Sequence, residues 1–109
     1  MIKTKEINGH TLVTFKETDK ITAINAEGLK KELNNIFNDN VKKLIISFEN
    51  INFIDSTGFG IFLSVMKTAE SNDGELKLCN VNQEIMKLFK LLHLDNVFDI
   101  YNTVDDCLK

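Results

Sequence analysis

Phe53-Ile54-Asp55-Ser56-Thr57-Gly58-Phe59-Gly60 is the most informative stretch of this sequence. An apolar segment ends in one acid and two hydroxyl residues, and two glycines then open an apolar run to about Glu70. Asp, Ser and Thr are all favoured just before a helix, because their side-chain oxygens accept hydrogen bonds from free backbone N–H groups. The stretch therefore predicts a helix start. Two glycines in a first helical turn weaken a helix, which indicates that a neighbouring strand or a partner protein approaches the backbone there.

Upstream of this helix start, the N-terminal residues predict a β-hairpin. Asn8-Gly9 separates two β-prone runs, Ile2 to Ile7 and His10 to Lys16. Asn-Gly between such runs is the strongest short hairpin signal, because both central residues of the turn need positive φ. We expect His10 to be an exposed strand residue, and residues 17–22 to form a polar loop.

Between the loop and the helix start, the pattern predicts one more helix and one buried strand. Apolar residues recur at helical spacing at positions Ala26, Leu29, Leu33 and Ile36. Asn25 is expected to cap this helix, and Asn38-Asp39-Asn40 to end it. The run Leu44 to Phe48 has no alternation, which is typical of a strand covered on both faces.

Downstream, strands and helices continue to alternate. Strands are expected from Glu75 to Val81 and from Val97 to Tyr101, and Thr103 with Asp106 predicts the start of a short terminal helix. Asn82 is expected to cap the helix between them, whose apolar face is Ile85, Leu88, Phe89 and Leu92. Two strands followed by alternating helices and strands indicate an α/β sandwich with a mixed sheet.

The composition sets broad limits on function. The chain has 109 residues, 43% of them hydrophobic, and a net charge of −3, so we expect one folded domain over residues 1–109. An acidic chain gives no electrostatic reason to bind nucleic acid or an anionic membrane. The longest apolar runs, Leu44 to Ile46 and Ile61 to Leu63, are too short for membrane insertion, and the N-terminus lacks the apolar core of a signal peptide. We therefore expect a cytoplasmic protein.

The residues also argue against a metal site and against common enzyme classes. Cys79 and Cys107 lack CxxC spacing and are expected to be free buried thiols, and His10 and His93 lie in different segments. A nucleophile elbow would need glycine where Ile54 stands. The Gly-Lys-Ser/Thr of a P-loop is absent from the sequence. We expect no catalytic residues, metal or cofactor.

The motif in its setting resembles the STAS domain, specifically the stand-alone bacterial anti-sigma factor antagonists. In that family Asp-Ser-Ser/Thr-Gly-Xaa-Gly follows the third strand and starts the second helix, and the stretch Leu44 to Ala69 fits this arrangement. The order of elements and the length match over nearly the whole chain. The resemblance implies a mixed sheet of about four to five strands with an N-terminal hairpin and about four helices packed on it.

The resemblance also implies a function. The family's phosphorylated serine directly follows the aspartate, which is Ser56 here, whereas Thr57 stands at a position that usually does not accept phosphate. We expect the protein to be a monomer. By resemblance, its unphosphorylated form binds an anti-sigma factor serine/threonine kinase and frees a sigma factor. Phosphorylation of Ser56 would end that binding, and a serine phosphatase would restore it.

The expected contact face combines the start of the second helix with the loop Asp19 to Ala23. Its residues are Asp55, Thr57, Gly58, Phe59 and Gly60 from the helix start and Ile21 and Thr22 from the loop. Phe59 is expected at its centre, because an apolar residue among polar ones suits the middle of an interface. Asp19 and Thr22 replace a glycine and an aspartate of the family pattern, which leaves the identity of the partner open.

Several alternatives remain at the level of sequence. Ser56 and Asp55 could act only in capping, and the glycines could only relieve crowding between helix and sheet. The chain could be an adaptor subunit of a membrane transporter or sensory complex. A third alternative is a receiver domain phosphorylated at Asp55, although such domains need an acidic pair after the first strand to hold Mg²⁺, and Asn8-Gly9-His10 supplies none.

Overall fold

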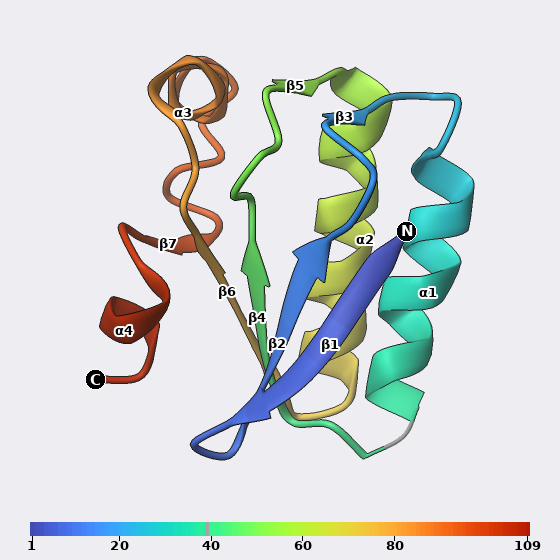
Figure 1. Cartoon of the computed structure of the whole chain (residues 1–109), viewed down its shortest axis with the longest axis vertical. Helices are drawn as coiled ribbons and strands as arrows, with labels where there is room; N and C mark the ends of the chain where they lie inside the picture. The colour runs from blue at the N-terminus through green and yellow to red at the C-terminus, as the bar shows by residue number, and fades with distance from the viewer. Residues whose placement is uncertain (39) are drawn as a thin grey trace.

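The computed structural model describes residues 1–38 and 40–109, and these form an α/β sandwich (Figure 1). The elements in chain order are β1 (Ile2–Ile7), β2 (His10–Phe15), β3 (Lys20–Ile21), α1 (Ala26–Asn38), β4 (Lys43–Ser47), β5 (Phe53–Ile54), α2 (Ser56–Ser71), β6 (Glu75–Cys79), α3 (Gln83–Leu91), β7 (Asp99–Tyr101) and α4 (Val104–Cys107). Within the described residues, five strands form a sheet in the order β1-β2-β4-β6-β7. β1 and β2 are antiparallel and the other pairs are parallel, so the predicted mixed sheet with an N-terminal hairpin is confirmed.

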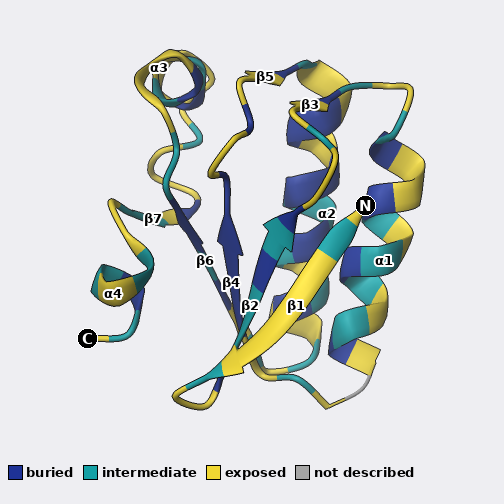
Figure 2. Cartoon of the chain, viewed as in Figure 1, coloured by how far each residue is buried: buried dark blue, intermediate teal, exposed yellow. Residues whose placement is uncertain are grey.

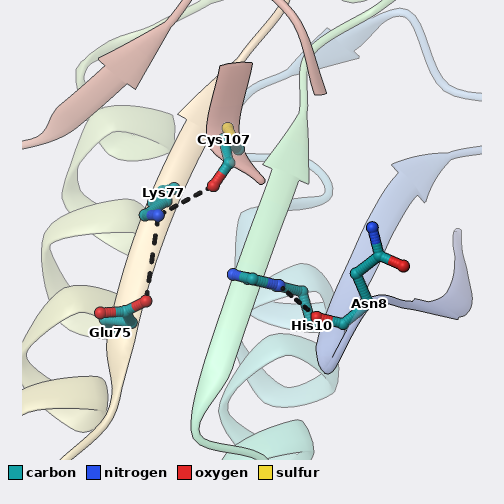
Figure 3. Close-up of polar contacts among 5 residues, drawn as sticks. All are labelled: Asn8, His10, Glu75, Lys77 and Cys107. Atoms are coloured by element: carbon teal, nitrogen blue, oxygen red, sulfur yellow. Dashed lines mark hydrogen bonds and ion pairs between the residues drawn. The ribbon is translucent and has the colours of Figure 1, made fainter. Parts of the chain in front are cut away.

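The hairpin turn forms at the predicted residues. Asn8 and Gly9 have φ of 49° and 80°, and Ile7 pairs with His10 across the turn. His10 is buried, contrary to expectation, and its Nδ1 lies 3.1 Å from the carbonyl oxygen of Asn8 (Figure 3). A side chain at the first residue after a tight turn can fold back onto the turn, which the alternation of strand residues does not reveal.

Helices α1 and α2 lie side by side along one face of the sheet (Figure 1). Alternate side chains of each strand point to this face, and each helix turns one row of apolar side chains toward it. The two sets pack together in a single core. Figure 2 shows the buried residues of both helices on the sides that face the sheet. The core here includes Val13, Phe15, Leu44, Ile46 and Leu78 from the strands and Leu29, Leu33, Phe62 and Val65 from the helices.

The opposite face of the sheet carries α4. A smaller buried cluster joins Ile45 of β4 and Cys79 of β6 to Cys107 of α4. Lys77 Nζ donates a hydrogen bond of 2.8 Å to the carbonyl oxygen of Cys107 and lies 4.0 Å from Oε1 of Glu75 (Figure 3). This lysine therefore helps to hold the end of the chain against the sheet.

Both cysteines are free and buried, as the sequence predicts. Burial, together with the neighbouring thiol of Cys107, raises the pKa of Cys79 to about 12. The pKa of Cys107 is also raised, again chiefly by burial. Both thiols are therefore protonated near neutral pH and act as small apolar groups of the core.

Two of the three predicted helix caps are confirmed. Asn82 Oδ1 accepts a hydrogen bond of 2.8 Å from Ile85 N, and Thr103 Oγ1 accepts one of 3.1 Å from Asp106 N. Asn25 differs, because its Oδ1 accepts from Thr22 N at 3.0 Å and its Nδ2 donates to the carbonyl of Lys20 at 2.8 Å. Its side chain thus holds the preceding loop instead of capping α1.

The buried faces of α1 and α3 differ from the predicted ones near the C-terminal ends of these helices. In α1, Phe37 is fully buried and Ile36 only partly, because Phe37 lies one turn after Leu33 on the face that meets the sheet. The expected end of α1 at residues 38–40 falls partly outside the described residues, since Asp39 is not among them. Leu92, the C-cap residue of α3, is exposed and does not belong to the buried face of that helix.

A short pair of strands joins the segment predicted as a polar loop, residues 17–22, to the apolar segment that precedes Asp55. Lys20 and Ile21 of β3 pair in parallel with Phe53 and Ile54 of β5. Two residues are too few to show a period in the sequence, so only the structure shows the pairing. The pair lies at the end of the molecule where α2 begins (Figure 1), and it brings the loop after β2 next to the start of that helix.

Candidate functional site

Asp55 is the residue that caps α2. Its backbone is extended, with φ of −92° and ψ of −178°, and its Oδ1 accepts a hydrogen bond of 2.8 Å from Gly58 N. The first helical residue is therefore Ser56, and Thr57 follows it. Of the three capping candidates in the sequence, the structure selects the acid, and it leaves both hydroxyl groups on the outside of the first turn.

Asp55 also ties the helix start to the loop after β3. Its second oxygen, Oδ2, accepts a hydrogen bond of 3.1 Å from Ala23 N, and its own N–H donates to the carbonyl of Ile21 at 3.1 Å. One carboxylate thus bridges the helix start and the loop. The structure brings together the two segments that the sequence predicts to share a contact face.

The two glycines of the motif have different surroundings. A Cβ on Gly58 would lie 2.7 Å from Ile54 Cγ2 and 2.8 Å from the carbonyl oxygen of Ile21, so this position has no room for a side chain. A Cβ on Gly60 would meet no described atom within 4 Å. Gly58 therefore allows α2 to pack closely against β3 and β5. Gly60 leaves the helix backbone uncovered at an exposed position.

Three residues expected on the contact face are buried instead. Phe59 is only 4% exposed and packs edge-on against Phe89 of α3, with ring centroids 5.0 Å apart. Ile21 and Gly58 are buried in the packing of β3 and β5 against α2. Phe59 and Ile21 are therefore part of the core in this structure and contribute no exposed surface to the predicted face. An apolar residue in the first turn of a helix that crosses a sheet faces the core as readily as a partner.

Thr57 and Gly60 of the predicted face reach solvent, and so does the predicted phosphoacceptor Ser56. Asp55 and Thr22 are half-buried, and both hold the loop: Thr22 Oγ1 accepts a hydrogen bond of 3.2 Å from Ile24 N. Ser56 lies at the N-terminus of a sixteen-residue helix. The partial positive charge of such an end favours a negative group. The site can therefore accommodate a phosphate on Ser56 without a change of fold.

Sequence reasoning missed two exposed apolar residues beside this helix start. Ile24, in the loop tied to Asp55, is 97% exposed, and Phe53 of β5 is 47% exposed. An apolar residue directly before a helical cap often packs on the residue four positions after the cap, which for a cap at Asn25 would pair Ile24 with Leu29. Only the structure shows that Ile24 projects from the surface.

The geometry also disfavours phosphorylation of Asp55 itself. Both of its carboxylate oxygens accept hydrogen bonds from backbone N–H groups.

Among residues 1–38 and 40–109, no group of three or more His, Cys, Asp or Glu side chains is arranged to hold a metal ion. Across the same residues, no helix has the length and apolar character needed to cross a membrane.

Replacing Asp55 tests its bridging role. We expect Asp55→Ala to lower the free energy of unfolding by about 1–2 kcal/mol, because both backbone N–H groups lose their acceptor. Asp55→Asn should lose less, since its amide oxygen can still accept from Gly58 N while its NH₂ group faces the N–H of Ala23. Urea unfolding gives the stability, and hydrogen exchange at the Ala23 amide should accelerate in both variants. Wild-type exchange at Ala23 in Asp55→Ala would contradict the bridge.

Comparisons with known proteins agree with this architecture. A family model described as STAS domain matches residues 1–107. The anti-sigma-B factor antagonist of Staphylococcus aureus (strain NCTC 8325) is 29% identical over 72 residues, which are 66% of this chain and 67% of that protein.

Two solved structures show the same fold. An anti-sigma-factor antagonist (STAS) domain protein from Planctomyces limnophilus superposes with a TM-score of 0.88 at 18% identity, covering 98% of this chain and 94% of that one. The Bacillus cell fate determinant SpoIIAA in its phosphorylated form superposes with a TM-score of 0.70 at 20% identity, covering 99% and 96%.

Proposed function

The chain belongs to the STAS domain family, and on that premise we propose that it is an anti-sigma factor antagonist switched by phosphorylation of Ser56. In its unphosphorylated form it binds an anti-sigma factor serine kinase through the surface around the start of α2 and so frees a sigma factor. A serine phosphatase reverses the modification. It acts by binding in the cytoplasm and is not an enzyme. The similarity to a curated anti-sigma-B factor antagonist supports this role.

The position of Ser56 carries the proposal. Its hydroxyl is exposed on the first residue of α2, beside a loop that Asp55 holds in place. A kinase can reach this oxygen and transfer the γ-phosphoryl group of ATP to it, releasing ADP and a proton. Phosphate adds about −1.5 to −2 of charge, and a helix N-terminus is the place where a fold tolerates that charge best.

The switch then operates at the interface. A partner that covers the helix start is complementary to a small neutral hydroxyl and to the bare backbone at Gly60. A phosphate there must lose its hydration or push the partner away, and both raise the free energy of the complex. No rearrangement of the sheet or helices is needed, because the change acts on the surface that the partner covers.

Mapping the phosphoacceptor tests this proposal. The protein is incubated with ATP and each purified anti-sigma factor serine kinase of the organism that encodes it. We expect one phosphate at Ser56 by tandem mass spectrometry, full modification of Thr57→Ala and none of Ser56→Ala. The two variants are matched controls, since both remove an exposed hydroxyl from the same helical turn. Modification of Ser56→Ala at the wild-type rate would overturn the assignment.

A further inference from the structure

We propose that Ile24 is the apolar anchor of the partner interface and that the anti-sigma factor presents a pocket for an aliphatic side chain next to its contact with Ser56. This inference rests on the proposed function. It adds that the pocket for Ile24 lets the anti-sigma factor recognise this particular antagonist. An exposed isoleucine alone would carry little weight, because single apolar residues are common on protein surfaces. Three further observations single out Ile24.

The first observation is that the loop around Ile24 is fully organised. Each backbone N–H from Thr22 to Asn25 has an acceptor: Thr22 N donates to Asn25 Oδ1, Ala23 N to Asp55 Oδ2, Ile24 N to Thr22 Oγ1 and Asn25 N to the carbonyl of Thr22, at 3.0 to 3.2 Å. The loop is thus fixed before any partner arrives. A preorganised contact loses less conformational entropy on binding, so more of its contact energy appears as affinity.

The second observation is that the expected intramolecular contact is missing. Ile24 stands directly before the residue whose carbonyl accepts the first α1 hydrogen bond, from Leu29 N at 3.1 Å. An apolar residue at that place often packs against a residue in the second turn of the helix. Here the side chain is 97% exposed, and the side chains of Asn25 and Thr22 bond to backbone groups within the loop.

The third observation is continuity with the proposed interface. Ala23, the neighbour of Ile24, is hydrogen-bonded to the residue that directly precedes Ser56. Phe53, also partly exposed, lies on the strand that leads into the same helix start. Ile24 and Phe53 thus belong to the two segments that adjoin the helix start at Ser56, and the loop carries Thr22 as a neutral hydroxyl. An apolar pocket beside the serine contact is the complement of this surface.

Removal of the Ile24 side chain tests the anchor. Binding of the purified anti-sigma factor kinase is measured by titration calorimetry for the wild type, Ile24→Ala and Ile24→Val. Burial of three fewer carbons predicts a roughly 50-fold weaker complex for Ile24→Ala, and Ile24→Val should lose roughly fourfold. The thermal unfolding midpoint should stay at the wild-type value, because Ile24 has almost no contacts within the fold.

Leu91→Ala is the matched control, since Leu91 is a second aliphatic residue that is 73% exposed, but it lies at the end of α3. We expect it to bind as tightly as the wild type. Wild-type affinity of Ile24→Ala, or an equal loss in Leu91→Ala, would overturn the anchor. Should phosphorylation of Ser56 still end binding in that case, the proposed function stands without it. Absence of any binding by the unmodified protein would overturn both.

Discussion

Gly58→Ala is expected to lower the free energy of unfolding by about 2–3 kcal/mol, because an added methyl group overlaps atoms that cannot move aside cheaply. Its Cβ would lie 2.7 Å from Ile54 Cγ2, 2.8 Å from the Ile21 carbonyl oxygen and 3.0 Å from Ile21 Cγ2. The carbonyl belongs to the backbone of β3 and accepts a hydrogen bond from Asp55 N, so a shift there also disturbs the loop. At roughly 4–8 °C per kcal/mol, the unfolding midpoint should fall by about 8–24 °C.

Gly60→Ala is the matched control for this prediction. It lies two residues further along the same helix, and its Cβ would enter open space among the described residues. Alanine is a better helix former than glycine by up to about 1 kcal/mol, so Gly60→Ala should leave stability unchanged or raise it. Differential scanning calorimetry of the two variants decides the point. Equal midpoints for Gly58→Ala and Gly60→Ala would contradict the packing described for β3, β5 and α2.

Ser56→Asp is expected to weaken the complex with the anti-sigma factor kinase on the order of 100-fold, because the partner must cover an unpaired charge. The fold should be retained, since an acid in the first turn of a helix is favourable for that helix. Calorimetric titration gives the affinity, and circular dichroism with thermal unfolding gives the fold and stability. We expect a much weaker affinity together with an unchanged circular dichroism spectrum and unfolding midpoint.

Ser56→Asn separates charge from size in this experiment. Asn has nearly the same shape as Asp but carries no charge, so it should lose much less affinity than Ser56→Asp. If both variants bind equally weakly, crowding and not charge prevents the contact. If both bind like the wild type, the surface around Ser56 is not covered by the partner.

The sequence predicts the main framework because each element carries a local signal. Asn8-Gly9 specifies a turn, Asn82 and Thr103 specify helix starts, and the period of apolar residues gives the buried faces. These signals depend on a residue and its near neighbours, and they remain valid in the folded chain. They suffice for the order of strands and helices that places Ser56 at the start of α2.

The sequence does not predict which residues of the site are accessible. Phe59 is apolar whether it faces a partner or Phe89, and the difference depends on where α3 packs, which no local pattern states. No local pattern states that Ile24 is exposed or that the Asn25 side chain accepts from Thr22 N instead of capping α1. Pairing of β3 with β5 and the bridge from Asp55 to Ala23 join residues more than thirty positions apart. Such long-range contacts determine which residues of the site are exposed. Local signals determine only which helices and strands carry those residues.

Affinity before and after phosphorylation of Ser56 is the most direct test of the switch. Protein carrying one phosphate at Ser56, verified by mass spectrometry, and unmodified protein are titrated into the same preparation of anti-sigma factor kinase. Heteronuclear NMR spectra of both forms report whether the fold is unchanged away from α2. We predict a tight complex with the unmodified protein, a loss of affinity of at least about 100-fold with the phosphorylated one, and chemical-shift changes confined to the start of α2 and residues 22–25. Equal affinity of the two forms, with Ser56 fully phosphorylated, would contradict the account.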